Sequence, residues 1–307
     1  MRLYFAPMEG ITDSVYRRLH HQYFPGLDRY YMPFFSPTMH RCLTNKEDRE
    51  LPMAESEGFV AVPQIMTKVS EDFIWAAQQC ADRGYQEVNL NLGCPSGTVV
   101  AKGKGAGMLA DPDALDHFLE RICSDSPIPV SVKTRLGLKS SEEFPRLLKI
   151  FDQYPIKELT IHPRIRTDFY KLPVQLDWFS YALENTKIPL CYNGDIDGLA
   201  VLKRMQARFP QVEAFMLGRG LVGDPGMLCP GGTDVRVLEQ FHDHLLEEYT
   251  FRFGSARNAM FRMKENWHYL SQHFDGGEKL FKNLRKTTDL DEYRRITIEI
   301  FRTLPRL

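Results

Sequence analysis

The chain has 307 residues, a formal net charge of −1, 43% hydrophobic residues and 26% charged residues. These values allow a sizeable buried core and exclude a global electrostatic attraction to nucleic acid or to anionic membranes, so any polyanion site must be a local patch. The segment MRLYFAPMEGITD has no long apolar run or small-residue cleavage site, and no stretch approaches 18 apolar residues. We therefore expect neither a signal peptide nor a membrane span. The six cysteines form no C-x-x-C pair, which disfavours a metal site and indicates a cytoplasmic protein with free thiols.

Eight apolar, β-rich runs recur along the chain. They cover residues 2–8, 29–35, 59–66, 87–93, 129–135, 158–164, 189–195 and 214–220. Helical patterns lie between the later runs, at residues 71–84, 111–124, 140–154 and 197–209. This alternation predicts parallel βαβ units, and the count of eight predicts a closed (β/α)8 TIM barrel. A doubly wound sheet is the alternative, but polar residues follow so many strands that a barrel, whose strand ends meet at one mouth, fits better.

The character of the sequence changes after Leu228. The segment CPGGTD contains structure-breaking Pro and Gly followed by two candidate helix caps, and only helical patterns follow it. An apolar stripe at helical spacing, from Met260 to Phe274, is typical of a helix core face. We predict two domains, a barrel over residues 1–229 and an all-helical domain over residues 233–307.

Several strand ends carry polar groups. NGD at 193–195 and GRG at 218–220 end the last two strands, where many barrels bind phosphate, and Arg219 suits phosphate oxygens. Two tight turns with a solvated Arg219 are the plainer interpretation. Lys133 and His162 end two further strands and could be ligand contacts or ordinary structural residues. Gln64 lies in an apolar run, where its amide needs hydrogen-bond partners that a heterocyclic ring could supply.

Cys94 lies in the run NLGCPSG, between a glycine and a proline just after a strand end, and the glycine-rich run GKGAG follows it. A buried thiol of this kind is often only a packed side chain. A free thiol has a pKa of about 8.5, so a protonated thiol could also act as a general acid, or as a nucleophile if that pKa were lowered. The residues alone leave these three roles open.

The sequence resembles the tRNA-dihydrouridine synthase family over the whole predicted barrel. The resemblance rests on APMEGITD (6–13), VPQIM (62–66), VNLNLGCPSGTVVAKGKGAGML (88–109), SVKTRLG (131–137), IHPR (161–164), YNGDI (192–196) and LGRG (217–220). It departs from the family pattern at Glu9, at Asn89 and at Pro163 after His162. It implies an FMN-binding barrel with a helical RNA-binding domain, and the reduction of the C5=C6 bond of tRNA uridines with NADPH.

The resemblance also implies roles for individual residues. The residues assigned to FMN are Pro7, Met8, Glu9, Gln64, Lys133, His162, Asn193, Gly194, Asp195, Gly218 and Arg219. Asn91 would place the target base, and Cys94 matches the proton donor of the family. An FMN barrel acting on a free small molecule is the alternative enzyme, and a non-catalytic RNA-binding protein is the alternative of another class.

A local positive patch is expected if tRNA is the substrate. Residues 252–286 contain eight Lys or Arg and three Asp or Glu, which gives a formal charge of +5. Arg257, Lys264 and His268 share one helix face and are the candidate phosphate contacts. A solvated helix face is the plainer interpretation. We expect a monomer that binds tRNA and has no metal site.

Overall fold

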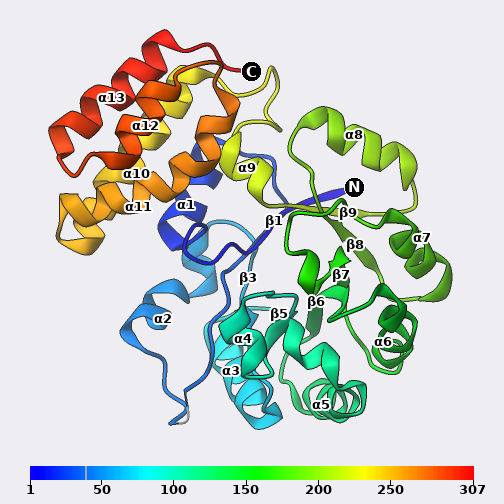
Figure 1. Ribbon diagram of the computed structural model, residues 1–307. Helices are drawn as coiled ribbons and strands as arrows, with labels where there is room; N and C mark the ends of the chain where they lie inside the picture. Colours follow the sequence, from blue (N-terminus) through cyan, green and yellow to red (C-terminus); the bar gives the residue numbers. More distant parts are fainter. Residues whose placement is uncertain (39) are drawn as a thin grey trace. The chain divides into compact units, whose positions relative to one another are not determined.

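The computed structural model describes residues 1–38 and 40–307, and its central element is a parallel sheet surrounded by helices (Figure 1). The strands are β1 (Arg2–Phe5), β2 (Arg29–Tyr31), β3 (Ala61–Val62), β4 (Gln64–Ile65), β5 (Val88–Leu92), β6 (Val130–Gly137), β7 (Leu159–Ile165), β8 (Leu190–Asn193) and β9 (Ala214–Leu217). Every one of the eight predicted runs contains a strand, and the run 59–66 contains two.

The sheet closes into a barrel. Its strand order is β3-β2-β1-β9-β8-β7-β6-β5-β4, so the two outermost strands are the two halves of one segment, interrupted only at Pro63. The interruption is bridged, because Tyr31 pairs with Val62 on one side and Phe35 pairs with Ile65 on the other. The predicted parallel barrel is therefore confirmed, and the doubly wound alternative is excluded.

Prolines shorten several strands relative to the predicted runs. β1 ends at Phe5, two residues before Pro7, and β2 ends at Tyr31, two residues before Pro33. Pro63 divides the third run into β3 and β4. Proline cannot donate to the ladder, so a strand pairs through the residues beside it rather than through the proline itself.

Thirteen α-helices occur in the described part of the chain. They are α1 (Ser14–Tyr23), α2 (Asn45–Glu50), α3 (Ser70–Asp82), α4 (Gly97–Ala101), α5 (Pro112–Asp125), α6 (Phe144–Phe151), α7 (Leu176–Asn185), α8 (Leu199–Arg208), α9 (Arg219–Gly223), α10 (Val235–Phe253), α11 (Ala256–Leu270), α12 (Glu278–Lys286) and α13 (Leu290–Thr303). Short 3-10 helices are η1 (Ala54–Glu57), η2 (Gly105–Ala110), η3 (Ser141–Glu143), η4 (Arg166–Asp168) and η5 (Ser271–His273).

The helix boundaries follow the caps that the sequence offers. Asp111 accepts a hydrogen bond from the N–H of Ala114 at the start of α5, and Pro112 occupies the first helical position. Asp234 caps α10 in the same way. Gly84 has a φ of +85°, which suits a helix end, just after α3. Each of these three residues therefore lies where a helix begins or ends.

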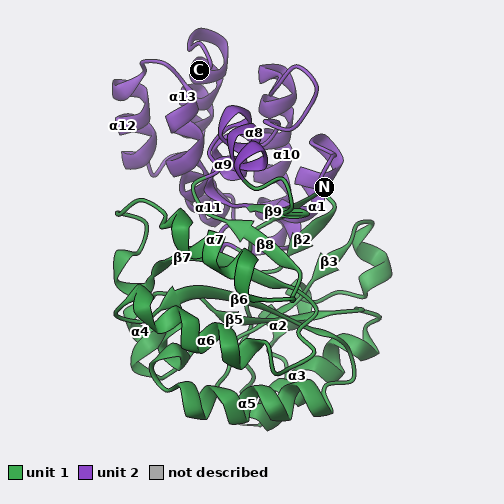
Figure 2. Ribbon diagram, turned by 90° about the vertical axis from the view of Figure 1, so that its right-hand side faces the viewer, with its two compact units in different colours: residues 1–7, 28–195, 209–216 green, residues 8–27, 196–208, 217–307 purple. Residues whose placement is uncertain are grey.

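The chain divides into two compact units, which Figure 2 shows in different colours. The first unit contains residues 1–7, 28–195 and 209–216, and the second contains residues 8–27, 196–208 and 217–307. The first unit holds most of the barrel sheet, whose interior is filled by a cluster of apolar side chains. Its members are Tyr4, Ala6, Tyr31, Val62, Cys191, Ala214 and Met216.

The second unit includes α10, α11, α12 and α13, so the segment after residue 233 is helical as predicted. The predicted apolar stripe is buried. Its members on α11 are Met260, Met263, Trp267 and Leu270, its last member Phe274 follows η5, and each is at most 4% exposed. The unit also contains α1, α8 and α9, which come from the barrel part of the sequence.

Candidate active site

Hydrogen-bonded side-chain amides connect the neighbouring strands β4 and β5 of the first unit. Gln64, which is fully buried, donates from Nε2 to Oδ1 of Asn89 at 2.8 Å and accepts at Oε1 from Nδ2 of Asn91 at 2.7 Å. Asn89 in turn donates to Oγ of Ser131 on β6 at 2.9 Å. Burial of these polar groups is tolerated because they satisfy one another. The amides of Gln64 and Asn91 are thereby fixed in orientation.

The turn that carries Cys94 is held from both sides. Oδ1 of Asn91 accepts hydrogen bonds from the N–H groups of Gly93, at 3.0 Å, and Cys94, at 2.9 Å. The carbonyl of Cys94 accepts from the N–H of Ala106 at 3.2 Å. Gly105 has a φ of +54°, and a Cβ there would lie 3.0 Å from Cβ of Cys94. The glycine-rich run thus packs directly against the cysteine, and glycine is required for that approach.

Lys133 on β6 contacts the end of β8. Its Nζ donates to Oδ1 of Asn193 at 2.8 Å, and Nδ2 of Asn193 donates to the carbonyl of Met216 at 2.7 Å. Burial, with a further contribution from the nearby Arg135 guanidinium, lowers the pKa of Lys133 to about 8. An ammonium with a neutral hydrogen-bond partner at the carboxyl end of a barrel is suited to an electron-rich ligand.

Arg135 points from the same strand and is only 1% exposed. Its Nε donates to the carbonyl of Gly93 at 3.0 Å, and its Nη1 donates to the carbonyls of Ile165 and Phe169, each at 3.0 Å. Burial lowers the pKa of this guanidinium. One arginine therefore ties the residue before Cys94 to the loop that follows β7.

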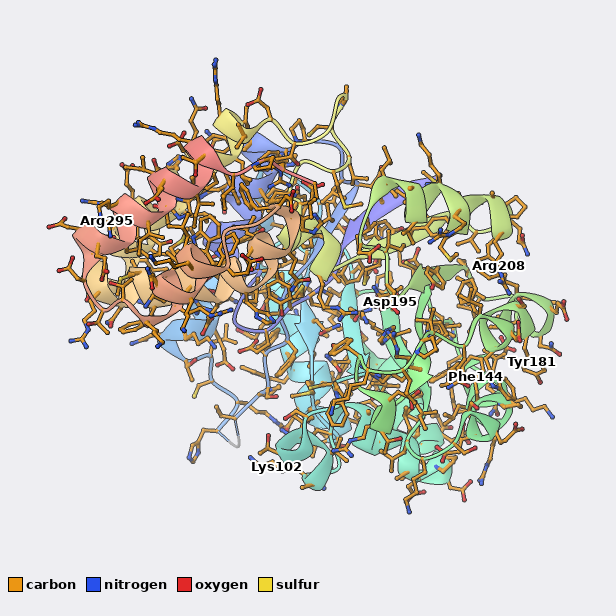
Figure 3. All side chains as sticks on the ribbon, turned by 45° about the horizontal axis from the view of Figure 1, so that its top comes forward. Lys102, Phe144, Tyr181, Asp195, Arg208 and Arg295 are labelled. Carbon is orange, nitrogen blue, oxygen red and sulfur yellow. The ribbon has the colours of Figure 1, made fainter. Side chains whose placement is uncertain are left out.

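A second arginine organises the ends of β7 and β8. Arg164 donates from Nη1 and Nη2 to the two carboxylate oxygens of Asp195, and Nη1 also lies 3.0 Å from Nε2 of His162. Arginine can only donate hydrogen bonds, so Nε2 of His162 accepts this one. In the neutral imidazole the ring proton is then on Nδ1. Asp195, labelled in Figure 3, follows β8 with a φ of +45°. A Cβ on Gly194 would lie 2.8 Å from Cγ1 of Val174 and 3.3 Å from Cδ2 of His162, so the backbone there is closely packed.

The first unit therefore brings together most of the predicted site residues, namely Gln64, Asn91, Cys94, Lys133, His162, Asn193, Gly194 and Asp195. Pro7, after β1, also belongs to it. Met8, Glu9, Gly218 and Arg219 belong to the second unit. There, the N–H of Met8 donates to Oγ1 of Thr12 at 2.9 Å, and the side chains of Glu9 and Arg219 are exposed.

The predicted basic face of α11 also lies in the second unit. Arg257 and Lys264 flank the ring of Phe261, with the guanidinium 5.7 Å and the ammonium 5.1 Å from its centroid. Lys264 also donates to the carbonyls of Thr287 and, at 3.4 Å, Arg285, and burial lowers its pKa. Lys264 therefore links α11 to the end of α12, whereas Arg257 and His268 are exposed.

Sequence reasoning missed the buried arginines. The alternation in SVKTR places Arg135 on the same strand face as Lys133, which was a usable signal. The role of Arg164 could not be read in this way, because its contacts with Asp195 and with the carbonyl of Leu172 form only in the folded chain. Over residues 1–38 and 40–307, there is no group of three or more His, Cys, Asp or Glu placed to hold a metal ion. No helix of that same part is long and apolar enough to cross a membrane.

Comparison with known proteins gives a consistent family. The model of the family described as dihydrouridine synthase matches residues 4–299. A tRNA-dihydrouridine synthase B from Pasteurella multocida is 31% identical over 73% of this chain and 67% of its own length. Those of Proteus vulgaris and Vibrio vulnificus are each 28% identical, covering 87% and 90% of this chain and 85% and 88% of their own lengths.

Solved structures share the fold. Morphinone reductase in complex with tetrahydroNAD superposes with a TM-score of 0.51 at 10% identity, over 74% of this chain and 85% of that chain. The old yellow enzyme homologue from Zymomonas mobilis gives 0.50 at 10% identity, over 73% and 86%. At this identity the likeness concerns the barrel architecture alone.

Proposed function

Because this chain belongs to the dihydrouridine synthase family, we propose that it reduces the C5=C6 bond of specific uridines in tRNA to 5,6-dihydrouridine. The cofactor in this proposal is FMN, and the reductant is NADPH. The family match covers nearly the whole chain, and the relatives named above are tRNA-modifying enzymes, which favours tRNA over a free small molecule as the substrate.

The observation that carries the proposal is the Cys94 turn. Asn91 holds its N–H groups, Arg135 holds the carbonyl before it, and Gly105 packs against its Cβ. So many restraints on one cysteine at the carboxyl end of a barrel strand indicate a reactive group that must be held at a defined place. A merely packed thiol would require none of them.

The residues of the first unit fit a flavin mononucleotide. Lys133 offers a positive charge, and Nε2 of Gln64 carries a second hydrogen beyond the one given to Asn89. His162 presents a ring whose proton is on Nδ1. Such amide, imidazole and ammonium donors suit the carbonyl and nitrogen edge of an isoalloxazine ring. FMN would supply the hydride for C6 of the uracil, with NADPH as its source.

The proton for C5 would come from the thiol of Cys94 acting as general acid. The hydride and this proton together saturate the C5=C6 bond, and the thiolate left behind is reprotonated from solvent. Asn91 would orient the uracil with the remaining hydrogen of its amide. A uridine in folded tRNA is stacked, so it must be extruded to reach a barrel strand end.

The remaining assignments complete the proposal. Asn193, Gly194 and Asp195 would bind the ribityl phosphate end through backbone groups, because the Asp195 carboxylate is already engaged by Arg164. Pro7, Met8, Glu9, Gly218 and Arg219 would supply further FMN contacts. Residues 1–229 would form the catalytic domain and residues 233–307 the tRNA-binding domain, with Arg257, Lys264 and His268 on its contact face. The protein would act as a monomer in the cytoplasm.

Nucleoside mass spectrometry of tRNA from a deletion strain tests the proposal. Dihydrouridine should be missing at one or more mapped positions, and it should return on complementation with the wild-type gene but not with Cys94→Ala. If purified protein loaded with FMN leaves tRNA unchanged and reduces free pyrimidines, the small-molecule alternative holds. A colourless protein that cannot be loaded with FMN would favour the non-catalytic RNA-binding alternative.

A further inference from the structure

Phe169 has an unusual backbone. Within residues 1–38 and 40–307, the non-glycine residues with a positive φ are Arg41, Phe169 and Asp195. Phe169 has φ of 49° and ψ of −104° at the end of η4, in the loop after β7. A bulky side chain rarely adopts such angles, and strain of this kind persists only where surrounding contacts impose it and tends to mark functional positions.

The backbone of Phe169 is held by an arginine of β6 that also contacts the Cys94 turn. Arg135 donates to the carbonyl of Phe169 and, with the same guanidinium, to the carbonyl of Gly93, which precedes Cys94. Arg166 donates from Nε to the carbonyl of Pro95 at 3.1 Å. The loop is therefore clamped to both sides of the Cys94–Pro95 pair by two arginines, and all these residues belong to the first unit.

The ring of Phe169 is oriented but only partly covered. The Arg166 guanidinium lies 5.2 Å from its centroid, while 37% of the residue remains exposed. Neighbouring Tyr170 is 51% exposed, and its ring lies 5.3 Å from the Arg135 guanidinium and 5.8 Å from the ring of His162. More than a third of Phe169 is therefore accessible to a ligand. A ligand with an aromatic face would use it, because aromatic and arginine groups are the usual stacking surfaces for unpaired bases.

We propose that Phe169, braced by Arg166, stacks against the nucleobase adjacent to the target uridine in the tRNA. Extruding one base removes a stacking partner from its neighbours, and a ring fixed beside the Cys94 turn can replace it. This inference rests on the proposed function. It adds a substrate contact from the barrel itself, which would help to decide which uridine sequence context is accepted.

The test compares substitutions at Phe169 on tRNA transcripts that lack modifications. With FMN-loaded protein, Phe169→Ala and Phe169→Leu should bind tRNA roughly 5- to 100-fold more weakly, as expected for loss of one base–aromatic stack. The loss should appear in KM for tRNA more than in kcat. Phe169→Tyr and Phe169→Trp should retain affinity. Leu172→Ala is the matched control, because Leu172 is an exposed apolar residue of the same loop, at 55%, without a ring.

One further variant and one modified tRNA separate stacking from loop conformation. Phe169→Gly suits a positive φ and should raise the thermal midpoint while still losing tRNA affinity. On a tRNA that carries an abasic site next to the mapped uridine, wild type and Phe169→Ala should bind equally. Wild-type affinity in Phe169→Gly or Phe169→Leu would overturn the inference. Failure of the wild type to form dihydrouridine would instead overturn the proposed function.

Discussion

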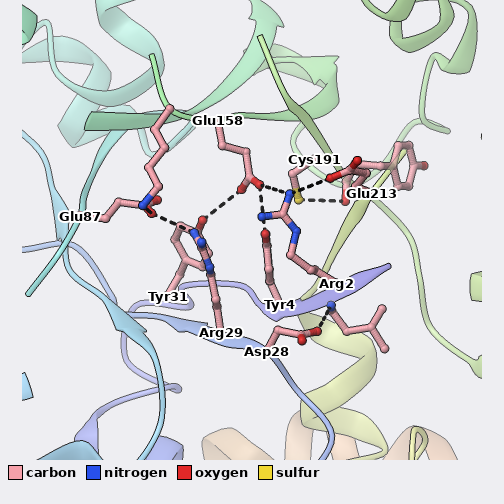
Figure 4. Close-up of polar contacts among 12 residues, drawn as sticks. Arg2, Tyr4, Asp28, Arg29, Tyr31, Glu87, Glu158, Cys191 and Glu213 are labelled. Carbon is pink, nitrogen blue, oxygen red and sulfur yellow. Dashed lines mark hydrogen bonds and ion pairs between the residues drawn. The ribbon is translucent and has the colours of Figure 1, made fainter. Parts of the chain in front are cut away.

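The two ends of the barrel in the first unit balance charge differently. At the amino-terminal ends of the strands, two buried glutamates meet cations and phenols (Figure 4). Glu158 accepts from the hydroxyls of Tyr4, at 3.0 Å, and Tyr31, at 3.3 Å, and Arg2 lies 3.5 Å away. Glu87 contacts Arg29 at 2.8 Å and Lys157 at 2.7 Å. Burial raises the pKa of Glu158, while the hydrogen bond from Tyr4 and the nearby guanidinium groups of Arg29 and Arg2 act in the opposite direction.

The carboxyl-terminal end holds cations whose partners are mostly neutral. Lys133 donates to the amide of Asn193, and Arg135 donates to three main-chain carbonyls. The third cation, Arg164, pairs with the carboxylate of Asp195. The difference teaches that one end is neutralised internally for stability, whereas the other retains positive charge that an electron-rich ligand can use.

The largest expected effect is at the carboxyl end. Cys94→Ala should lower kcat for dihydrouridine formation by about 10²- to 10⁴-fold, the usual contribution of a general acid, without loss of FMN or tRNA binding. Single-turnover assays with reduced enzyme measure the chemical step directly. Cys123→Ala, a partly buried free thiol on α5, is the control and should keep full activity. Unchanged turnover in Cys94→Ala would remove the acid role.

A change at the amino-terminal end should affect stability and not chemistry. Glu158→Ala leaves the buried hydroxyls of Tyr4 and Tyr31 without their acceptor, which should cost about 1–3 kcal/mol of unfolding free energy for each. Urea unfolding measures the loss, and kcat of the folded protein should stay at the wild-type value. Glu213→Ala, which removes the exposed partner of Arg2, should leave the unfolding midpoint unchanged. A fall in kcat for Glu158→Ala would contradict this separation of the two ends.

The lowered pKa of Lys133 predicts a pH dependence of stability. Between pH 8 and its ordinary value near 10.5, the lysine is protonated in the unfolded chain but largely neutral in the folded protein. The unfolded state then binds more protons, so this group makes stability rise with pH, by up to about 1.4 kcal/mol per pH unit. Urea unfolding of FMN-free protein from pH 7.5 to 10.5 should show this slope in the wild type but not in Lys133→Met. Lys139→Met, an exposed residue past β6, is the control.

The smallest effect is expected on α11 of the second unit. Arg257→Ala should weaken tRNA binding and reduce the slope of log affinity against log salt by about one, as for loss of a single phosphate contact. Lys264→Ala should weaken tRNA binding as well and should also lower the thermal midpoint, because its ammonium donates to carbonyls at the end of α12. Filter binding at several salt concentrations gives the slope. An unchanged slope in Arg257→Ala would remove this residue from the tRNA contact face.

Much of the barrel could be predicted from the sequence because the spacing of apolar residues indicates strands and helices locally. Alternation and apolar runs located all eight strand segments, and caps such as Asp111 and Asp234 located helix starts. The exact strand ends could not be predicted as well, since a run such as 29–35 has apolar residues beyond the end of β2 at Tyr31. The grouping of residues 8–27 and 196–208 with the later helices also depends on long-range packing.

The residues of the candidate site could be predicted from the sequence, but the hydrogen bonds between their side chains could not. Cys94, Lys133 and Asn193 were visible as polar residues at strand ends. The Gln64 amide, however, proved to bond Asn89 and Asn91, a consequence of the register that sets Gln64 opposite Asn89. Register between strands is decided by the closed sheet, and no single strand encodes it.

The sequence by itself determined the barrel, the family and the position of Cys94 just after β5, because local periodicity and short motifs carry that information. Only the tertiary structure decided what surrounds the cysteine. Arg135 and Arg166 are distant from Cys94 in the chain, and their hydrogen bonds to Gly93 and Pro95 form only when β6 pairs with β5 and β7 pairs with β6. A restraint that joins residues across strands exists only after the strands have paired.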